Sequence, residues 1–212
     1  NIHLIHGITG SGKTEVYIDL IDYTISKGKA VIVLIPEIAL TYQTVMRFTR
    51  RFGDRVSIIN SRLSKGERYD QFERAKNGDV DIMIGPRSAL FTPFKNLGLI
   101  IIDEEHESAY KSESVPKYHA TEVAIKRVKD VGATLVLGSA TPSVESYYRA
   151  KNGAYKLHVL NKREKGNLPE VHVVDLREEL KNENKSIFSI ELQNLIKDRL
   201  EKKQQTMLFI NR

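Results

Sequence analysis

The chain has 212 residues, a net charge of +6 and no cysteine. Disulfide bonds and thiolate metal sites are therefore excluded within it, and no apolar run reaches the ~18–20 residues that span a bilayer. The basic charge alone does not separate a protein that binds polyanions from an ordinary, mildly basic protein.

Seven short runs rich in apolar residues are predicted to be strands: residues 2–6, 30–35, 56–60, 80–85, 97–103, 134–138 and 155–160. Several are apolar at consecutive positions, as in strands that are buried on both faces. Helical patterns lie between them, over residues 16–25, from a capping box at Ser64 and Glu67 to Gly78, and from an N-cap at Thr141 to Gly153. This alternation predicts an α/β fold with a mainly parallel sheet flanked by helices.

The pattern changes after residue 160. Residues 161–170 are polar, contain Gly and Pro, and are predicted to be a linker. Strands are predicted at 171–177 and 206–210, with a helix from Ser189 to Lys203 between them. Residues 171–212 therefore look like the opening of a second α/β domain after a first domain at 1–160. Since the chain begins inside one predicted strand and stops just after another, we expect a piece of a longer protein.

The stretch GITGSGKT fits the phosphate-binding pattern G-x-x-x-x-G-K-[ST], and it follows a predicted strand and opens a predicted helix. Backbone amides of such a loop turn toward phosphate oxygens, and the helix dipole adds to the anion site. We expect Lys13 to reach the β- and γ-phosphates of ATP and Thr14 to ligate Mg²⁺. The predicted ATP-binding residues are Gly7, Ile8, Thr9, Gly10, Ser11, Gly12, Lys13 and Thr14.

The stretch DEEH follows a buried strand, at the edge where α/β sheets place their ligands. We expect Asp103 to hold Mg²⁺ and Glu104 to orient or deprotonate the attacking water. An acidic turn in solvent is the alternative for DEEH alone, but a phosphate-binding loop in the same chain favours catalysis. Lys13, Asp103 and Glu104 are thus the predicted catalytic residues, and Glu105 is interpreted as a solvated neighbour.

Three further segments are polar and lie at predicted strand ends. Residues 138–142, GSATP, place hydroxyl groups near the γ-phosphate and also suit a helix cap. PEIALTYQ and GPRSALF suit either turn chemistry or contacts to a sugar–phosphate backbone. The residues of these two segments that are predicted to contact DNA are Pro36, Glu37, Thr41, Gln43, Arg87 and Ser88.

The segment directly behind DEEH mixes aromatic and basic side chains. Rings of tyrosine and histidine offer faces on which unpaired bases stack, and lysines meet phosphates. The alternative is a loop whose tyrosines pack on the sheet edge. The predicted DNA contacts of this segment are Tyr110, Lys111, Tyr118 and His119.

In this order, GITGSGKT, PEIALTYQ, GPRSALF, DEEH and GSATP resemble the first motor lobe of superfamily 2 helicases, and more closely those of replication restart. The resemblance implies a RecA-like P-loop NTPase domain at 1–160 and the first strands and helix of a second RecA-like lobe at 171–212. It implies an ATP-dependent 3′-to-5′ DNA helicase with ATP and Mg²⁺ as cofactors. It also implies that hydrolysis is coupled to DNA by His106, Ser139, Ala140 and Thr141.

The same resemblance implies partners and a location. The implied partners are single-stranded and forked DNA, single-strand-binding protein and other primosome components, with no membrane. The implied location is the bacterial cytoplasm, in association with the nucleoid. It places an arginine finger, adenine recognition and a zinc module outside these residues, so we expect the chain alone to bind ATP weakly and not to unwind DNA. The alternatives are a non-catalytic, nucleotide-gated DNA-binding or scaffold module and a P-loop transporter or kinase-like ATPase.

Overall fold

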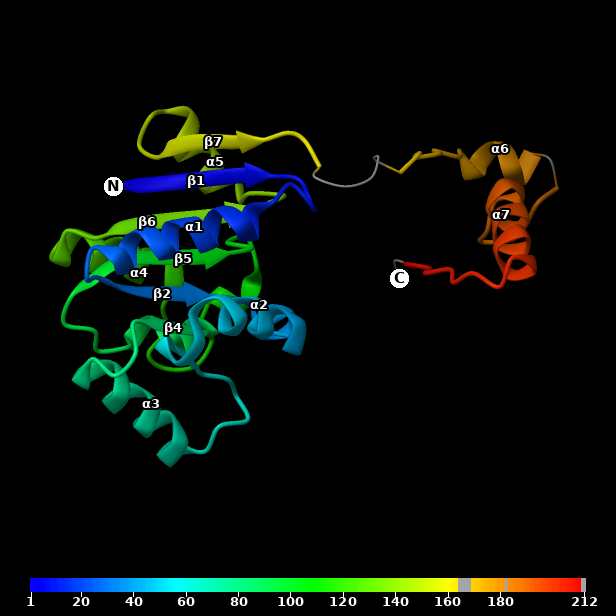
Figure 1. Ribbon diagram of the computed structural model, residues 1–212. Coiled ribbons are helices and arrows are strands. Elements are labelled where there is room, and N and C mark those ends of the chain that lie inside the picture. The colour runs from blue at the N-terminus through cyan, green and yellow to red at the C-terminus, as the bar shows by residue number, and fades with distance from the viewer. Residues whose placement is uncertain (164–168, 182, 211–212) are drawn as a thin grey trace. The chain divides into compact units, whose positions relative to one another are not determined.

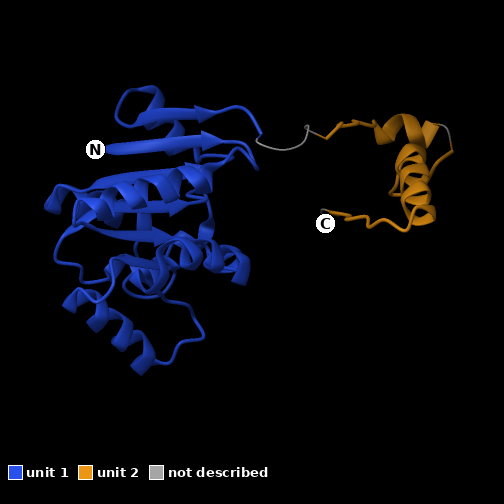
Figure 2. Cartoon of the chain, in the orientation of Figure 1, with its two compact units in different colours: residues 1–166 blue, residues 167–212 orange. Residues whose placement is uncertain are grey.

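The computed structural model describes residues 1–163, 169–181 and 183–210. The chain divides into two compact units, Asn1–Gly166 and Asn167–Arg212 (Figure 2). Half of the predicted linker, residues 164–168, lies outside the described part. None of the helices in the described ranges is both long and apolar enough to cross a bilayer.

A seven-stranded sheet forms the centre of the first unit (Figure 1). Its strands lie in the order β3-β4-β2-β5-β6-β1-β7, and every neighbouring pair is parallel. The bounds are β1 (Ile2–Gly7), β2 (Ala30–Leu34), β3 (Val56–Ile58), β4 (Ile82–Gly85), β5 (Leu97–Asp103), β6 (Thr134–Ser139) and β7 (Lys156–Leu160). All seven predicted strands and the parallel α/β class are confirmed.

The central strands are apolar on both faces because helices cover both. Consecutive residues of β2 point to opposite faces of the sheet, so Val31 and Ile32 belong to two separate hydrophobic clusters. One face packs against α1 (Lys13–Ser26) and α2 (Tyr42–Phe52), and the other against α3 (Lys65–Asn77), α4 (Ala120–Val131) and α5 (Val144–Lys151). The predicted capping box is confirmed, since Glu67 N donates to Ser64 Oγ and Ser64 N to Glu67 Oε2.

The parallel order fixes where a site can form. β5, β6 and β1 are consecutive neighbours in the sheet, with Asp103 opposite Gly138 and Ser139 opposite His6. The carboxyl ends of these strands therefore meet at one edge, where ligands of such sheets bind. Short 3₁₀ turns at Glu37–Ala39, Arg87–Phe91 and Ser108–Tyr110 follow β2, β4 and β5, and a fourth at Gly53–Arg55 precedes β3.

The second unit differs from the prediction. It contains α6 (Leu176–Lys181) and α7 (Ile190–Glu201), and Glu179 Oε2 accepts a hydrogen bond from Ile190 N at 2.8 Å. The predicted helix is confirmed, but the predicted strands at 171–177 and 206–210 are wrong: no described residue of either range is in a strand. An isolated apolar run has no ladder partner here, and Val173 and Phe209 are more than nine-tenths exposed.

Candidate nucleotide and nucleic-acid site

The loop from Gly7 to Thr14 joins the end of β1 to the start of α1. Gly10 and Gly12 have φ of 79° and 83°, a left-handed conformation that favours glycine. Lys13 Nζ donates to Gly7 O at 2.8 Å and lies 3.9 Å from Glu104 Oε1. Ser11 Oγ is buried and has no hydrogen-bond partner among the described atoms. An unpaired buried hydroxyl beside turned backbone amides fits a loop that receives phosphate oxygens.

Asp103 ends β5 directly beside this loop. Its Oδ1 accepts a hydrogen bond from the Tyr17 hydroxyl at 2.9 Å, which ties α1 to the DEEH segment. Burial raises the pKa of the Asp103 carboxyl, and the bond from Tyr17 opposes that rise. Burial and the nearby Asp103 charge both raise the pKa of Tyr17, so the hydroxyl stays a donor. Sequence reasoning missed Tyr17.

Gly138 explains how Tyr17 comes so close to the sheet. A Cβ added at Gly138 would lie 1.7 Å from the Tyr17 hydroxyl oxygen. Real Cβ atoms do not approach an oxygen so closely, so any larger residue at this position would force Tyr17 to move. The first residue of GSATP therefore leaves room for the tyrosine that holds Asp103.

Glu104 leaves the strand direction. Its φ is 47°, which is uncommon for a residue with a Cβ. Its carboxylate lies between Lys13 and His106, with Glu104 Oε2 3.7 Å from His106 Nδ1. Two of the three predicted catalytic side chains, Lys13 and Glu104, thus face each other, and Asp103 is adjacent.

The predicted coupling residues come together. His106 Nδ1 lies 2.7 Å from Ser139 Oγ, and His106 Nε2 lies 3.5 Å from Thr141 Oγ1. Thr141 N donates to Ser139 Oγ at 2.9 Å, and Ala140 lies between the two in the chain. The prediction that Thr141 is the N-cap of the next helix is wrong, because this network occupies it; Ser143 caps α5 instead.

Glu105 was interpreted as a solvated neighbour, and this is wrong. Its side chain is only 3% exposed. Glu105 Oε1 accepts from Ser143 N at 2.7 Å, while Oε2 accepts from Ser143 Oγ at 3.2 Å and from Ser146 Oγ at 3.0 Å. Three donors from the start of α5 replace the water that a buried carboxylate loses.

A groove of about 340 Å³ lies next to the DEEH segment, and its lining includes Pro36, Glu37, Arg87, Ser88 and Tyr110. It therefore gathers half of the ten predicted DNA contacts at the ends of β2, β4 and β5. Thr41 and Gln43 are not among the lining residues. Thr41 is the N-cap of α2, where its Oγ1 accepts from Thr44 N, and Gln43 is exposed in the first turn of α2.

Tyr110 does not offer its ring to solvent. It is 1% exposed, and its hydroxyl donates to the carbonyl oxygens of Leu34, at 3.1 Å, and Asp103, at 2.6 Å. Base stacking needs an open ring face, so burial contradicts the prediction that Tyr110 stacks on a base. Arg87 Nη1 donates to the carbonyl oxygens of Ala109 and Lys111, at 3.1 and 2.6 Å, on either side of Tyr110.

The rest of the segment forms a short closed loop. Lys111 and His119 form an isolated antiparallel bridge, and Ser112 N donates to Tyr118 O at 2.8 Å. The Tyr118 ring packs edge-on against Phe91, with ring centroids 5.4 Å apart. Lys111 and His119 are exposed and Tyr118 is half-buried, so all three remain proposed DNA contacts.

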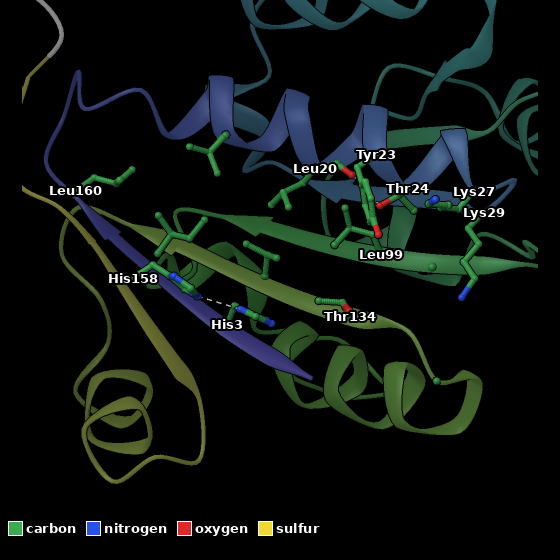
Figure 3. A pocket seen from close by; sticks show the side chains of 15 residues that line it. His3, Leu20, Tyr23, Thr24, Lys27, Lys29, Leu99, Thr134, His158 and Leu160 are labelled. Carbon is green, nitrogen blue, oxygen red and sulfur yellow. Dashed lines mark hydrogen bonds between the residues drawn. The ribbon is translucent and has the colours of Figure 1, made fainter.

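A larger cavity of about 630 Å³ lies elsewhere, between α1 and the sheet (Figure 3). Apolar side chains such as Leu20, Leu99 and Leu160 line it, together with the His3–His158 pair and Lys27. No residue of the phosphate-binding loop or of DEEH belongs to its lining. Although this cavity is larger than the groove beside DEEH, it is therefore not the candidate nucleotide site.

The comparisons with known proteins agree with this geometry. Residues 3–150 match the family model described as DEAD/DEAH box helicase. The replication restart protein PriA of Bacillus subtilis (strain 168) is 51% identical over 215 residues, which cover 100% of this chain and 26% of that protein. PriA of Haemophilus influenzae is 44% identical over 213 residues, which cover 100% of this chain and 29% of that protein. The chain thus spans about a quarter of the length of these relatives.

Solved structures support the fold alone, because their sequence identity is low. The Pyrococcus furiosus Hef helicase domain has a TM-score of 0.55 at 22% identity, and the match covers 78% of this chain and 35% of that one. RecG, solved bound to a three-way DNA junction, has a TM-score of 0.54 at 24% identity, covering 80% of this chain and 22% of that one. The RecA-like fold and the expected resemblance to replication-restart helicases are confirmed. The chain belongs to the DEAD/DEAH box helicase family.

Proposed function

We propose that this chain is the ATP-binding motor part of a DNA helicase that moves 3′-to-5′ and acts in replication restart and primosome assembly. The observation that carries the proposal is the meeting of three motifs at one sheet edge. Lys13 lies 3.9 Å from Glu104, and His106 lies 2.7 Å from Ser139. Resemblance to the PriA proteins supports the replication-restart role.

ATP and Mg²⁺ fit the residues at this edge. The unpaired Ser11 hydroxyl and the glycine-rich turn suit phosphate oxygens, and Lys13 is the first residue of α1. Among the described residues, no three His, Cys, Asp or Glu side chains would hold a metal by themselves. A magnesium ion here would depend on Thr14, Asp103 and the nucleotide, as is usual for Mg²⁺ at phosphates.

When bound, Mg²⁺ neutralises charge on the phosphates during phosphoryl transfer. The chain's own residues do the rest. Lys13 meets the phosphates, and Glu104 orients or deprotonates the attacking water. His106 couples this site to the GSATP segment through its contacts with Ser139 and Thr141.

DNA is proposed to contact the groove and the loop that follows it. Single-stranded and forked DNA are the proposed substrates, and single-strand-binding protein and other primosome components are proposed partners of the full-length protein. A second lobe beginning within residues 171–212 and an arginine finger beyond these residues complete the proposed motor. Arginine fingers contribute about 10³–10⁵ in rate, so we expect the 212 residues alone to bind ATP weakly, hydrolyse it slowly and not unwind DNA.

The test is the ATPase rate of the full-length protein with and without single-stranded DNA. We expect DNA to stimulate hydrolysis, and we expect Lys13→Ala and Glu104→Gln each to remove it. Equal inertness of the wild type and both variants would instead indicate a non-catalytic, nucleotide-gated DNA-binding or scaffold module. ATPase activity without any response to DNA would favour a transporter-like or kinase-like ATPase.

A further inference from the structure

Glu105 occupies the middle of the DEEH segment but faces away from the nucleotide loop. Its buried carboxylate receives three hydrogen bonds from Ser143 and Ser146, and within the described part of the chain no lysine, arginine or histidine forms an ion pair with it. The positive end of the α5 dipole and these donors therefore stabilise the charge. So many contacts around one carboxylate fix its position closely.

The main chain at Glu105 is fixed as well. Although β5 ends at Asp103, Glu105 N donates to Gly138 O at 3.0 Å, which ties the main chain of Glu105 to the end of β6. Side chain and main chain together attach Glu105 to the GSATP segment and to α5. The residue before it, Glu104, is the one that adopts a φ of 47°.

A left-handed conformation at a residue with a Cβ persists only where its surroundings hold it. Glu104 is held on one side by Asp103 at the end of β5 and on the other by the attachments of Glu105. This conformation directs the Glu104 carboxylate toward Lys13 and His106. We infer that Glu105 is a positioning residue, which sets the place of the Glu104 carboxylate for hydrolysis by anchoring the chain to α5.

This inference rests on the proposed function, so its test uses the full-length protein and separates catalysis from binding. We expect Glu105→Ala to lower kcat for DNA-stimulated ATP hydrolysis at least tenfold, because misplacement of a reacting group by about 1 Å costs on the order of 10²-fold. We expect the affinity for a fluorescent ATP analogue to stay within about threefold, since the loop from Gly7 to Thr14 keeps its own contacts.

Conservative and control variants sharpen the test. Glu105→Gln has the same size, and its amide can accept from Ser143 N while donating to a serine hydroxyl, so we expect kcat within about threefold of wild type. Glu145→Ala removes an exposed carboxylate from the first turn of the same helix and should change nothing. If Glu105→Ala fails to fold, Ser146→Ala removes one of the three donors, and we expect a kcat loss of at least about threefold.

Two results would overturn the inference. One is a Glu105→Ala protein with a lower melting temperature but unchanged kcat, since that residue would then serve stability alone. The other is a solved structure of the Glu105→Ala chain in which φ of Glu104 and its distance to Lys13 are unchanged. The structural result decides the inference even if the wild type hydrolyses no ATP, an outcome that would refute only the proposed function.

Discussion

Replacing Tyr17 by phenylalanine tests the link between α1 and the DEEH segment. The change removes the hydroxyl that donates to Asp103 Oδ1 at 2.9 Å and keeps the buried ring. A hydrogen bond to a charged group contributes about 1.5–3 kcal/mol. Asp103 is half-buried, so we use the lower end, about 1.5 kcal/mol, and loss of this bond raises the pKa of Asp103 further.

The sign of the pH dependence follows from that rise. Burial already raises the pKa of Asp103 above its usual value of 3.8, so the folded state holds more protons than the unfolded state between the two values. The contribution of Asp103 to stability therefore falls as pH rises through this window. The Tyr17→Phe variant widens the window, so its loss of stability is largest near pH 7 and shrinks as pH falls through the folded pKa.

Urea unfolding of the 212-residue chain at several pH values measures this effect. We expect a loss of about 1.5 kcal/mol at pH 7 and a smaller loss near pH 4. Tyr23→Phe is the matched control, because Tyr23 lies on the same helix but is 65% exposed. In full-length protein, the acid limb of the ATPase profile should move to higher pH in Tyr17→Phe. Equal stabilities of the two variants at pH 7 would refute the argument.

Three further substitutions test other contacts. Gly138→Ala should lower the free energy of unfolding by about 1–3 kcal/mol in urea titrations, because its Cβ would overlap the Tyr17 hydroxyl; an unfolding curve like that of wild type would contradict this. Thr41→Ala should cost about 1 kcal/mol by the same measurement, since Thr41 caps α2; a loss of DNA affinity without loss of stability would contradict this and support Thr41 as a DNA contact. Arg87→Ala should reduce DNA stimulation of the full-length ATPase about fivefold, because the carbonyl oxygens of Ala109 and Lys111 lose about 1 kcal/mol of hydrogen bonding. Unchanged stimulation would show that the hydrogen bonds from Arg87 have no part in the response to DNA.

The central sheet was predictable because its signal is local. Runs such as residues 97–103 are apolar at almost every position, and strands buried on both faces have this composition. The same signal failed at 171–177 and 206–210, where short apolar runs are not in strands. A strand needs a neighbour to pair with, and the residues of a short run do not reveal whether one is present.

The candidate site was predictable where a motif carries it and not where the fold creates it. Lys13, Asp103 and Glu104 are recognisable from their motifs, the role of His106 is implied by the resemblance, and the four residues converge. Tyr17 reaches Asp103 across 86 positions in the chain, and nothing local announces that pairing. One feature of the sequence does relate to this contact, because Gly138 has no Cβ and leaves room for the Tyr17 hydroxyl. This role of Gly138 is recognisable only once β5 and β6 are known to be neighbours in the sheet.

The sequence-based prediction also failed where residues within a polar stretch are buried. Tyr110 lies in a run of serine, lysine and glutamate, which favours an exposed loop. Its hydroxyl nevertheless finds two carbonyl oxygens at strand ends, those of Leu34 and Asp103, and these contacts compensate for burying it. The alternative that tyrosines pack on the sheet edge therefore holds for Tyr110, while the exposed Lys111 keeps its place in the proposed DNA track.

Three adjacent carboxylates at the end of a buried strand would repel one another if all pointed to the same space. In a regular strand, alternate residues share a face, so Asp103 and Glu105 would lie together. The left-handed turn at Glu104 prevents this by ending the strand after Asp103. Each carboxylate then meets a different set of donors: Tyr17 for the first, Lys13 for the second and the start of α5 for the third. The left-handed backbone at Glu104 thus separates the three carboxylates, so that two meet donors on α1 and the third meets donors at the start of α5.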